Sequence, residues 1–110
     1  MTASRVVRSD PAIRDLDEIW DHLAIEASPE IADFVIARLY EALYRAAENP
    51  LLHREREEYS GRPRRVNVFR YAIFYEQLPE ADGIFVWRII HGARYLPDLV
   101  SRPPFPVDTD

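Results

Sequence analysis

The chain has 110 residues, which suits a single domain with its own hydrophobic core. It contains neither cysteine nor lysine, which excludes disulfides, Cys-ligated zinc, a cysteine nucleophile and a Schiff-base lysine. With 47% hydrophobic and 30% charged residues, no signal-peptide core and no apolar run near the ~20 residues of a membrane span, we expect a globular, cytoplasmic protein without membrane contact.

The charges are unevenly distributed along the chain. Residues 1–58 carry 13 acids and 7 arginines, whereas residues 59–110 carry 6 acids and 7 arginines. No acid lies between Tyr59 and Tyr75, a stretch that contains Arg62, Arg64, Arg65 and Arg70. A net charge of -5 therefore does not exclude a local surface that binds anions.

The first half of the chain predicts a short strand followed by two helices. Residues 4–8 alternate weakly, as in a short strand. Ser9-Asp10-Pro11 supplies an N-cap and a proline at the first helical position, and apolar residues then recur every 3–4 positions over 11–26. Ser28-Pro29 repeats this signal and predicts a second helix over 29–48, which Asn49-Pro50 ends.

The second helix has an unusually wide apolar arc. On a helical wheel it covers roughly 200°, more than packing on one side requires, and Phe34 lies outside even this arc. The favoured interpretation is a helix wedged between its neighbour and a sheet. The alternative is spare apolar surface for a partner, centred on Tyr40 and Tyr44.

The second half predicts three strands, over 65–69, 71–77 and 84–91, with turn residues at 78–83. The last strand is almost continuously apolar and should be central, covered on both faces. The fold class is therefore α+β: a short N-terminal strand, an antiparallel two-helix hairpin packed on a sheet, then a three-stranded antiparallel sheet. Residues 1–100 form one domain, and residues 101–110 are predicted to form a flexible tail.

Four segments together resemble one family. They are the opening helix Ala12–Trp20, the helix end Asn49-Pro50, the strand Arg70–Glu76 and the final strand and turn Arg88–Leu99. This pattern is similar to ParE-like toxins of the RelE/ParE superfamily of type II toxin–antitoxin systems, over about residues 5–100. The resemblance implies a non-enzymatic inhibitor of DNA gyrase, held silent in a hetero-oligomer with a ParD-like antitoxin. Direct nucleic-acid binding without the antitoxin is not expected.

Two other functions stay open. RelE-like relatives are ribosome-dependent mRNA endoribonucleases, and here such a centre would use Arg88, His91, Arg94 and Tyr95. These nucleases commonly place an arginine in the third strand where this chain has Ala72, which disfavours cleavage. The third possibility is a binding module that keeps the fold without toxicity.

The candidate binding residues each have a structural alternative. Arg64, Arg65 and Arg70, with Tyr71 and Tyr75, could bind phosphate or an acidic partner, or they could form a solvated strand face. Tyr40 and Tyr44 are candidates for contact with the target or the antitoxin. For His91, the alternative to acid–base chemistry is a histidine that ties the strand end to the next turn, and this is favoured.

A stripe of possible metal ligands runs along the first helix. Glu18, His22 and Glu26 are spaced i, i+4 and i+8, and such side chains can bind zinc. Asp17 and Asp21 beside them favour a solvated acidic face instead. We therefore expect no metal and no cofactor.

Overall fold

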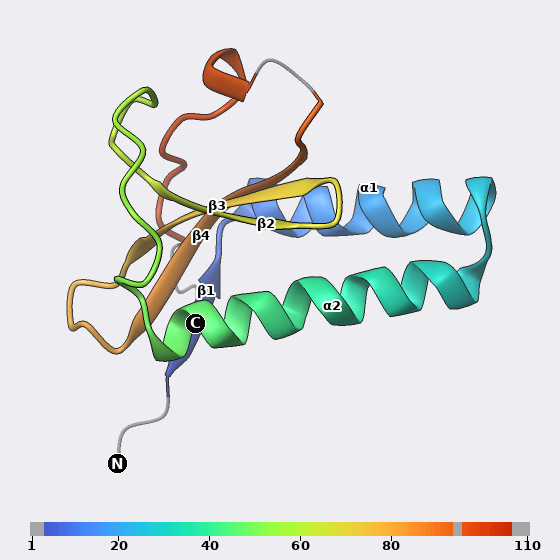
Figure 1. Cartoon of the computed structure of the whole chain (residues 1–110), viewed down its shortest axis with the longest axis horizontal. Coiled ribbons are helices and arrows are strands. Elements are labelled where there is room, and N and C mark those ends of the chain that lie inside the picture. The colour runs from blue at the N-terminus through green and yellow to red at the C-terminus, as the bar shows by residue number, and fades with distance from the viewer. Residues whose placement is uncertain (1–3, 94–95, 107–110) are drawn as a thin grey trace.

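The computed structural model describes residues 4–93 and 96–106 and confirms the α+β class (Figure 1). Its elements agree with the predicted boundaries to within one residue. In chain order they are β1 (Arg5–Arg8), α1 (Asp10–Glu26), α2 (Pro29–Glu48), β2 (Arg64–Val68), β3 (Tyr71–Gln77), β4 (Gly83–His91) and a 3₁₀ turn (Leu96–Asp98).

Side-chain caps begin both helices, as their sequences predict. The hydroxyl of Ser9 accepts a hydrogen bond from the backbone N–H of Ala12 at 3.0 Å, and that of Ser28 accepts one from Ile31 at 3.1 Å. Ser9 is also fully buried and donates to the carbonyl oxygen of Trp87 at 2.7 Å. The first cap therefore fixes α1 on the central strand as well as starting the helix.

The four strands form one sheet in the order β1-β4-β3-β2. The predicted antiparallel unit is confirmed, because β4 pairs with β3 and β3 pairs with β2 in that sense. The central place of β4 is confirmed as well. β1 adds a fourth strand parallel to β4, so the sheet as a whole is mixed rather than antiparallel. A parallel pair cannot be joined by a tight turn, and here the chain passes through both helices, β2 and β3 before it reaches β4.

Each face of the sheet is covered by a different part of the chain. The two helices lie on one face, where their apolar side chains pack against Ile73, Tyr75, Ile84, Val86 and Ile89. The opposite face is covered by Tyr59 of the α2–β2 connection and by Leu96 and Val100. α2 contacts α1, β1, β4 and β2, so it is wedged between its neighbour and the sheet, as favoured from the sequence.

The segment after Val100 lies against this second face as far as the structure describes it. Pro103 is buried, the Phe105 ring centroid is 4.9 Å from that of Phe85, and Arg102 Nε is 2.7 Å from Glu76 Oε1. These contacts place Arg102 and Phe105 against strand side chains, and the flexibility predicted for residues 101–110 stays a prediction. Residues 107–110 lie outside the described part of the chain.

Candidate partner-binding surface

The pairing of β3 with β4 is irregular at the point where candidate site residues begin. Phe74 lies opposite Arg88 and Tyr75 lies opposite Val86, so Trp87 has no partner in the register. Such a bulge inserts one residue and changes the direction of the side chains that follow. Beyond it, β4 ends with Ile89, Ile90 and His91 beside α1.

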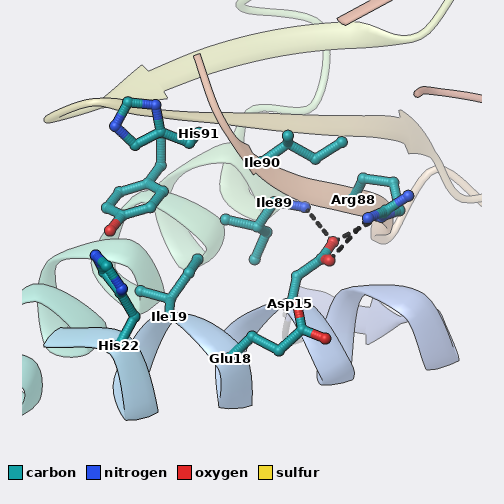
Figure 2. A pocket seen from close by; sticks show the side chains of 9 residues that line it. Asp15, Glu18, Ile19, His22, Arg88, Ile89, Ile90 and His91 are labelled. Atoms are coloured by element: carbon teal, nitrogen blue, oxygen red, sulfur yellow. Dashed lines mark hydrogen bonds and ion pairs between the residues drawn. The ribbon is translucent and has the colours of Figure 1, made fainter. Parts of the chain in front are cut away.

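A cleft of about 360 Å³ lies between α1 and this end of the sheet (Figure 2). α1 contributes Asp15, Glu18, Ile19 and His22, and the strands contribute Tyr71 and residues 88–91. Asp15 and Arg88 point toward each other across one end, and His22 and His91 lie at the other end. The cleft therefore brings together Arg88, His91 and Tyr71 of the predicted site residues.

Arg88 is fully engaged with Asp15. Its Nε and Nη2 atoms donate to the two carboxylate oxygens at 2.7 and 2.9 Å, and Asp15 also accepts from the backbone N–H of Ile89 at 2.9 Å. The bidentate hydrogen bond raises the pKa of Arg88 above its usual value. Asp15 holds Nε and Nη2, and the Leu99 carbonyl oxygen lies 3.3 Å from Nη1, so each guanidinium nitrogen already has an acceptor, which disfavours the phosphate-binding role expected of Arg88 in a nuclease.

His91 is positioned by the turn that follows it. Its Nδ1 accepts a hydrogen bond from the backbone N–H of Ala93 at 3.2 Å, the geometry expected of a histidine that ties the strand end to the next turn. Its ring meets the Tyr71 ring edge-on, with centroids 5.7 Å apart, and partial burial raises the pKa of Tyr71. Of the other nuclease candidates, Arg94 and Tyr95 lie outside the described residues.

The three predicted arginines do not form one surface. Arg64 donates to the carbonyl oxygen of His53 at 2.6 Å. Arg65 instead lies over the Phe74 ring, because neighbouring residues of a strand face opposite sides. Arg70 is exposed in the two-residue turn between β2 and β3.

Arg65 and Arg70 meet at a second cleft on the β2–β3 hairpin. This cleft has a volume of about 380 Å³ and is also lined by Asn67, Phe69, Tyr71 and residues 91–93. These lining residues include two arginines and no carboxylate. Of the arginines between Tyr59 and Tyr75, this cleft brings Arg65 and Arg70 together, and anion binding there stays a prediction.

The predicted tyrosines occupy three different environments. Tyr75 is fully buried among the helix-facing side chains, and burial raises its pKa to about 12, so it cannot contact a partner in this conformation. The Tyr40 hydroxyl accepts a hydrogen bond from Arg8 of β1 at 2.5 Å. Tyr44 is 55% exposed. Tyr40 thus lies beside β1, with the Tyr44 ring 6.3 Å from its own, whereas Tyr71 lies beside His91 in the first cleft.

An exposed aromatic pair at the hairpin tip was not predicted. The Phe69 ring lies 6.2 Å from that of Phe34 on α2, and the Arg38 guanidinium lies 5.1 Å from the Phe34 ring centre. Phe69 has a φ of +53°, in a two-residue hairpin where glycine is preferred. A side chain in this region costs about 1–2 kcal/mol. Phe34 stands outside the apolar arc of its helix, which is the sequence signal that could have drawn attention to it.

The possible metal ligands of α1 do not converge. Glu18 and His22 line the first cleft, whereas Glu26 lies at the end of the helix. Across residues 4–93 and 96–106, no three His, Cys, Asp or Glu side chains are grouped so that they could hold a metal ion. In the same ranges, no helix combines the length and the hydropathy needed to cross a membrane.

Residues 6–96 match the family described as "ParE toxin of type II toxin-antitoxin system, parDE". The chain belongs to the ParE toxin family. A similar fold occurs in a solved chain described as "Chromosomal ParDE TA system from P. aeruginosa", with a TM-score of 0.67 and 18% sequence identity over 82% of this chain and 96% of that chain. No curated protein matches the sequence. This ParE-family toxin therefore carries the family's fold with two clefts at one end of its sheet.

Proposed function

We propose that this ParE-family toxin acts by binding DNA gyrase and inhibiting it, without catalysing a reaction of its own. The observation that carries the proposal is the engagement of Arg88 by both carboxylate oxygens of Asp15. A nuclease needs a free cation for the scissile phosphate together with a general acid and a general base. Among the described residues that line the first cleft, Arg88 is the one arginine and is held by Asp15, and the Nδ1 of His91 already accepts a backbone hydrogen bond, so Glu18, His22 and Tyr71 have no free arginine beside them.

A ParD-like antitoxin would neutralise the toxin by covering the side of α2 that faces the β1 edge. Tyr44 is exposed there, and Tyr40 is half-buried under Arg8. β1 is the end strand of the sheet, so its outer edge offers backbone groups for strand addition. A disordered antitoxin segment could therefore fold on this edge and bury the apolar surface of α2, giving a hetero-oligomer in the cytoplasm.

The experiment that tests the proposal compares gyrase inhibition with translation arrest. Purified toxin should inhibit supercoiling by DNA gyrase, and adding the antitoxin should restore it. In cells, induction of the toxin should cause DNA damage and filamentation while protein synthesis initially continues. Unimpaired supercoiling, together with cut mRNA and an immediate stop of translation, would show that the toxin is a nuclease.

A further inference from the structure

The β2–β3 hairpin presents an aromatic surface that the fold itself does not require. Phe69 is 60% exposed and Phe34 is 53% exposed, although their rings contact each other. The hairpin lies over the helical layer, and its turn places Phe69 beside α2 (Figure 1). Because both rings stay more than half exposed, their mutual contact removes little apolar surface from water. The free energy gained from this contact therefore does not explain the strained turn.

Arg62 and Ala81 also have positive φ angles, so what sets Phe69 apart is that its strained backbone carries a large, exposed aromatic ring. Glycine would satisfy the positive φ of this hairpin position at no steric cost, whereas phenylalanine is strained there. Strained residues persist where the surrounding structure holds them, and they cluster at binding sites. A rigid, pre-positioned ring also loses little conformational freedom when it binds, which favours affinity.

We infer that Phe34 and Phe69 are the apolar anchor by which the toxin docks on its target, a folded protein that offers an apolar pocket bordered by carboxylates. This inference rests on the proposed function, because it names the surface that the target contacts. The carboxylates are inferred from charge complementarity: the described residues that line the cleft next to Phe69 include Arg65 and Arg70 and no acid. Aromatic residues and arginines are also the side chains that dominate binding energy in protein interfaces.

The shape and place of this surface favour the target over the antitoxin. A disordered antitoxin segment needs a groove or a strand edge along which to fold, and the proposed antitoxin surface at Tyr40, Tyr44 and β1 provides one. Phe69 instead caps a hairpin at the β2 end of the sheet, the end opposite β1. A ring on a rigid turn fits a preformed pocket. Single-stranded nucleic acid is disfavoured, because two arginines neutralise few phosphates and the whole chain is acidic.

The test uses Phe69→Gly in the full chain, because this variant removes the ring and relieves the turn. Its melting temperature should be equal to or above that of the wild type, so lost function cannot be attributed to unfolding. We expect its affinity for purified gyrase to fall at least about tenfold, its toxicity in cells to fall in parallel, and its affinity for the antitoxin to change less than about twofold. Phe34→Ala should behave in the same way. Leu51→Ala is the matched control, because it removes an apolar side chain that is 59% exposed away from the aromatic pair. This variant should leave the affinity for gyrase, the toxicity and the affinity for the antitoxin unchanged.

Three results would overturn the inference. The first is unchanged toxicity of Phe69→Gly, and the second is a loss of antitoxin affinity of similar size, which would place the aromatic pair in the antitoxin interface. The third is binding of a labelled single-stranded DNA that disappears in Phe69→Gly. Failure of the proposed function is separate from these: a wild-type toxin that is toxic yet leaves gyrase unimpaired refutes gyrase as the target. In that case, toxicity lost in Phe69→Gly with antitoxin binding retained still supports the docking surface.

Discussion

Asp15 and Arg88 lie 73 residues apart in the sequence and form a bidentate ion pair that joins α1 to the central strand. The side chain of Asp15 is only 9% exposed and that of Arg88 is 28% exposed. Asp15 also accepts a hydrogen bond from the Ile89 N–H, so it provides an acceptor for a backbone donor that follows the bulge. The pair therefore fixes how α1 packs on β4, and it occupies Arg88, the one arginine among the described residues that line the first cleft.

Breaking this pair should destabilise the fold strongly. Asp15→Ala leaves the buried Ile89 N–H and the Arg88 guanidinium without their acceptor, and we expect a loss of about 2–3 kcal/mol in the free energy of unfolding. Arg88→Met should also destabilise the fold, because it leaves the buried carboxylate of Asp15 without its cationic partner. Urea denaturation should show that the double variant loses less free energy of unfolding than the sum of the losses in the two single variants. Strict additivity would mean that the two side chains do not act as a pair.

The two helix caps should contribute differently to the free energy of unfolding, although both are serines. Ser9→Ala removes the cap of α1 and also the bond to the Trp87 carbonyl, so we expect a loss of about 2 kcal/mol. Ser28→Ala removes only the contact with Ile31, and we expect a loss of about 1 kcal/mol. Thermal denaturation of the two variants compares them directly. Equal losses would show that the bond between Ser9 and β4 contributes nothing.

Local signals such as these caps explain why the helices could be predicted almost to the residue. Ser9-Asp10-Pro11 and Ser28-Pro29 act within one helical turn, so the chain itself specifies where each helix begins. Likewise, the apolar run of β4 predicts a strand covered on both faces, and the structure confirms it.

Features that depend on distant residues could not be predicted in this way. The partner of β1, the engagement of Arg88 by Asp15 and the contact of Phe69 with Phe34 all join residues far apart in the sequence. Tyr75 shows the same limit, because alternation places it on one face of its strand but does not say that a helix covers that face.

Gly83 should be required for the pairing of β1 with β4. A Cβ atom at this position would lie 1.9 Å from the Arg5 carbonyl oxygen and 2.6 Å from the Arg5 nitrogen, so backbone atoms would have to move. We expect Gly83→Ala to cost about 3 kcal/mol or more. Gly92→Ala is the matched control, because its Cβ would lie 3.3 Å from the Arg70 carbonyl oxygen and needs only a small adjustment. Chemical denaturation should separate the two variants clearly, and similar stability would contradict the assigned strand pairing.

Tyr75 should make the toxin lose stability at alkaline pH. Burial raises its pKa from 10.0 to about 12, so the unfolded chain releases this proton at a lower pH than the folded one. The contribution of Tyr75 to the free energy of unfolding is therefore fully present below about pH 10. It is lost as the pH rises toward 12, and the loss amounts to up to about 2–3 kcal/mol. Tyr75→Phe should flatten this part of the stability curve, whereas Tyr44→Phe, at an exposed site, should not. A Tyr75→Phe curve that falls as steeply as that of the wild type would contradict the buried, neutral hydroxyl.

His91→Ala separates binding from catalysis. The ring accepts the Ala93 N–H and packs against Tyr71, so its loss should cost about 1 kcal/mol and loosen the end of β4. For an inhibitor that binds gyrase, toxicity should fall only as far as this loosening disturbs the neighbouring hairpin. For a nuclease that uses His91, the cleavage rate should fall by ~10²–10⁴ and toxicity should disappear. The measurement is growth after induction, together with mRNA integrity and supercoiling activity in the same cells. A wild-type chain that cuts mRNA rapidly and a His91→Ala variant that does not would establish catalysis at this cleft in place of gyrase binding.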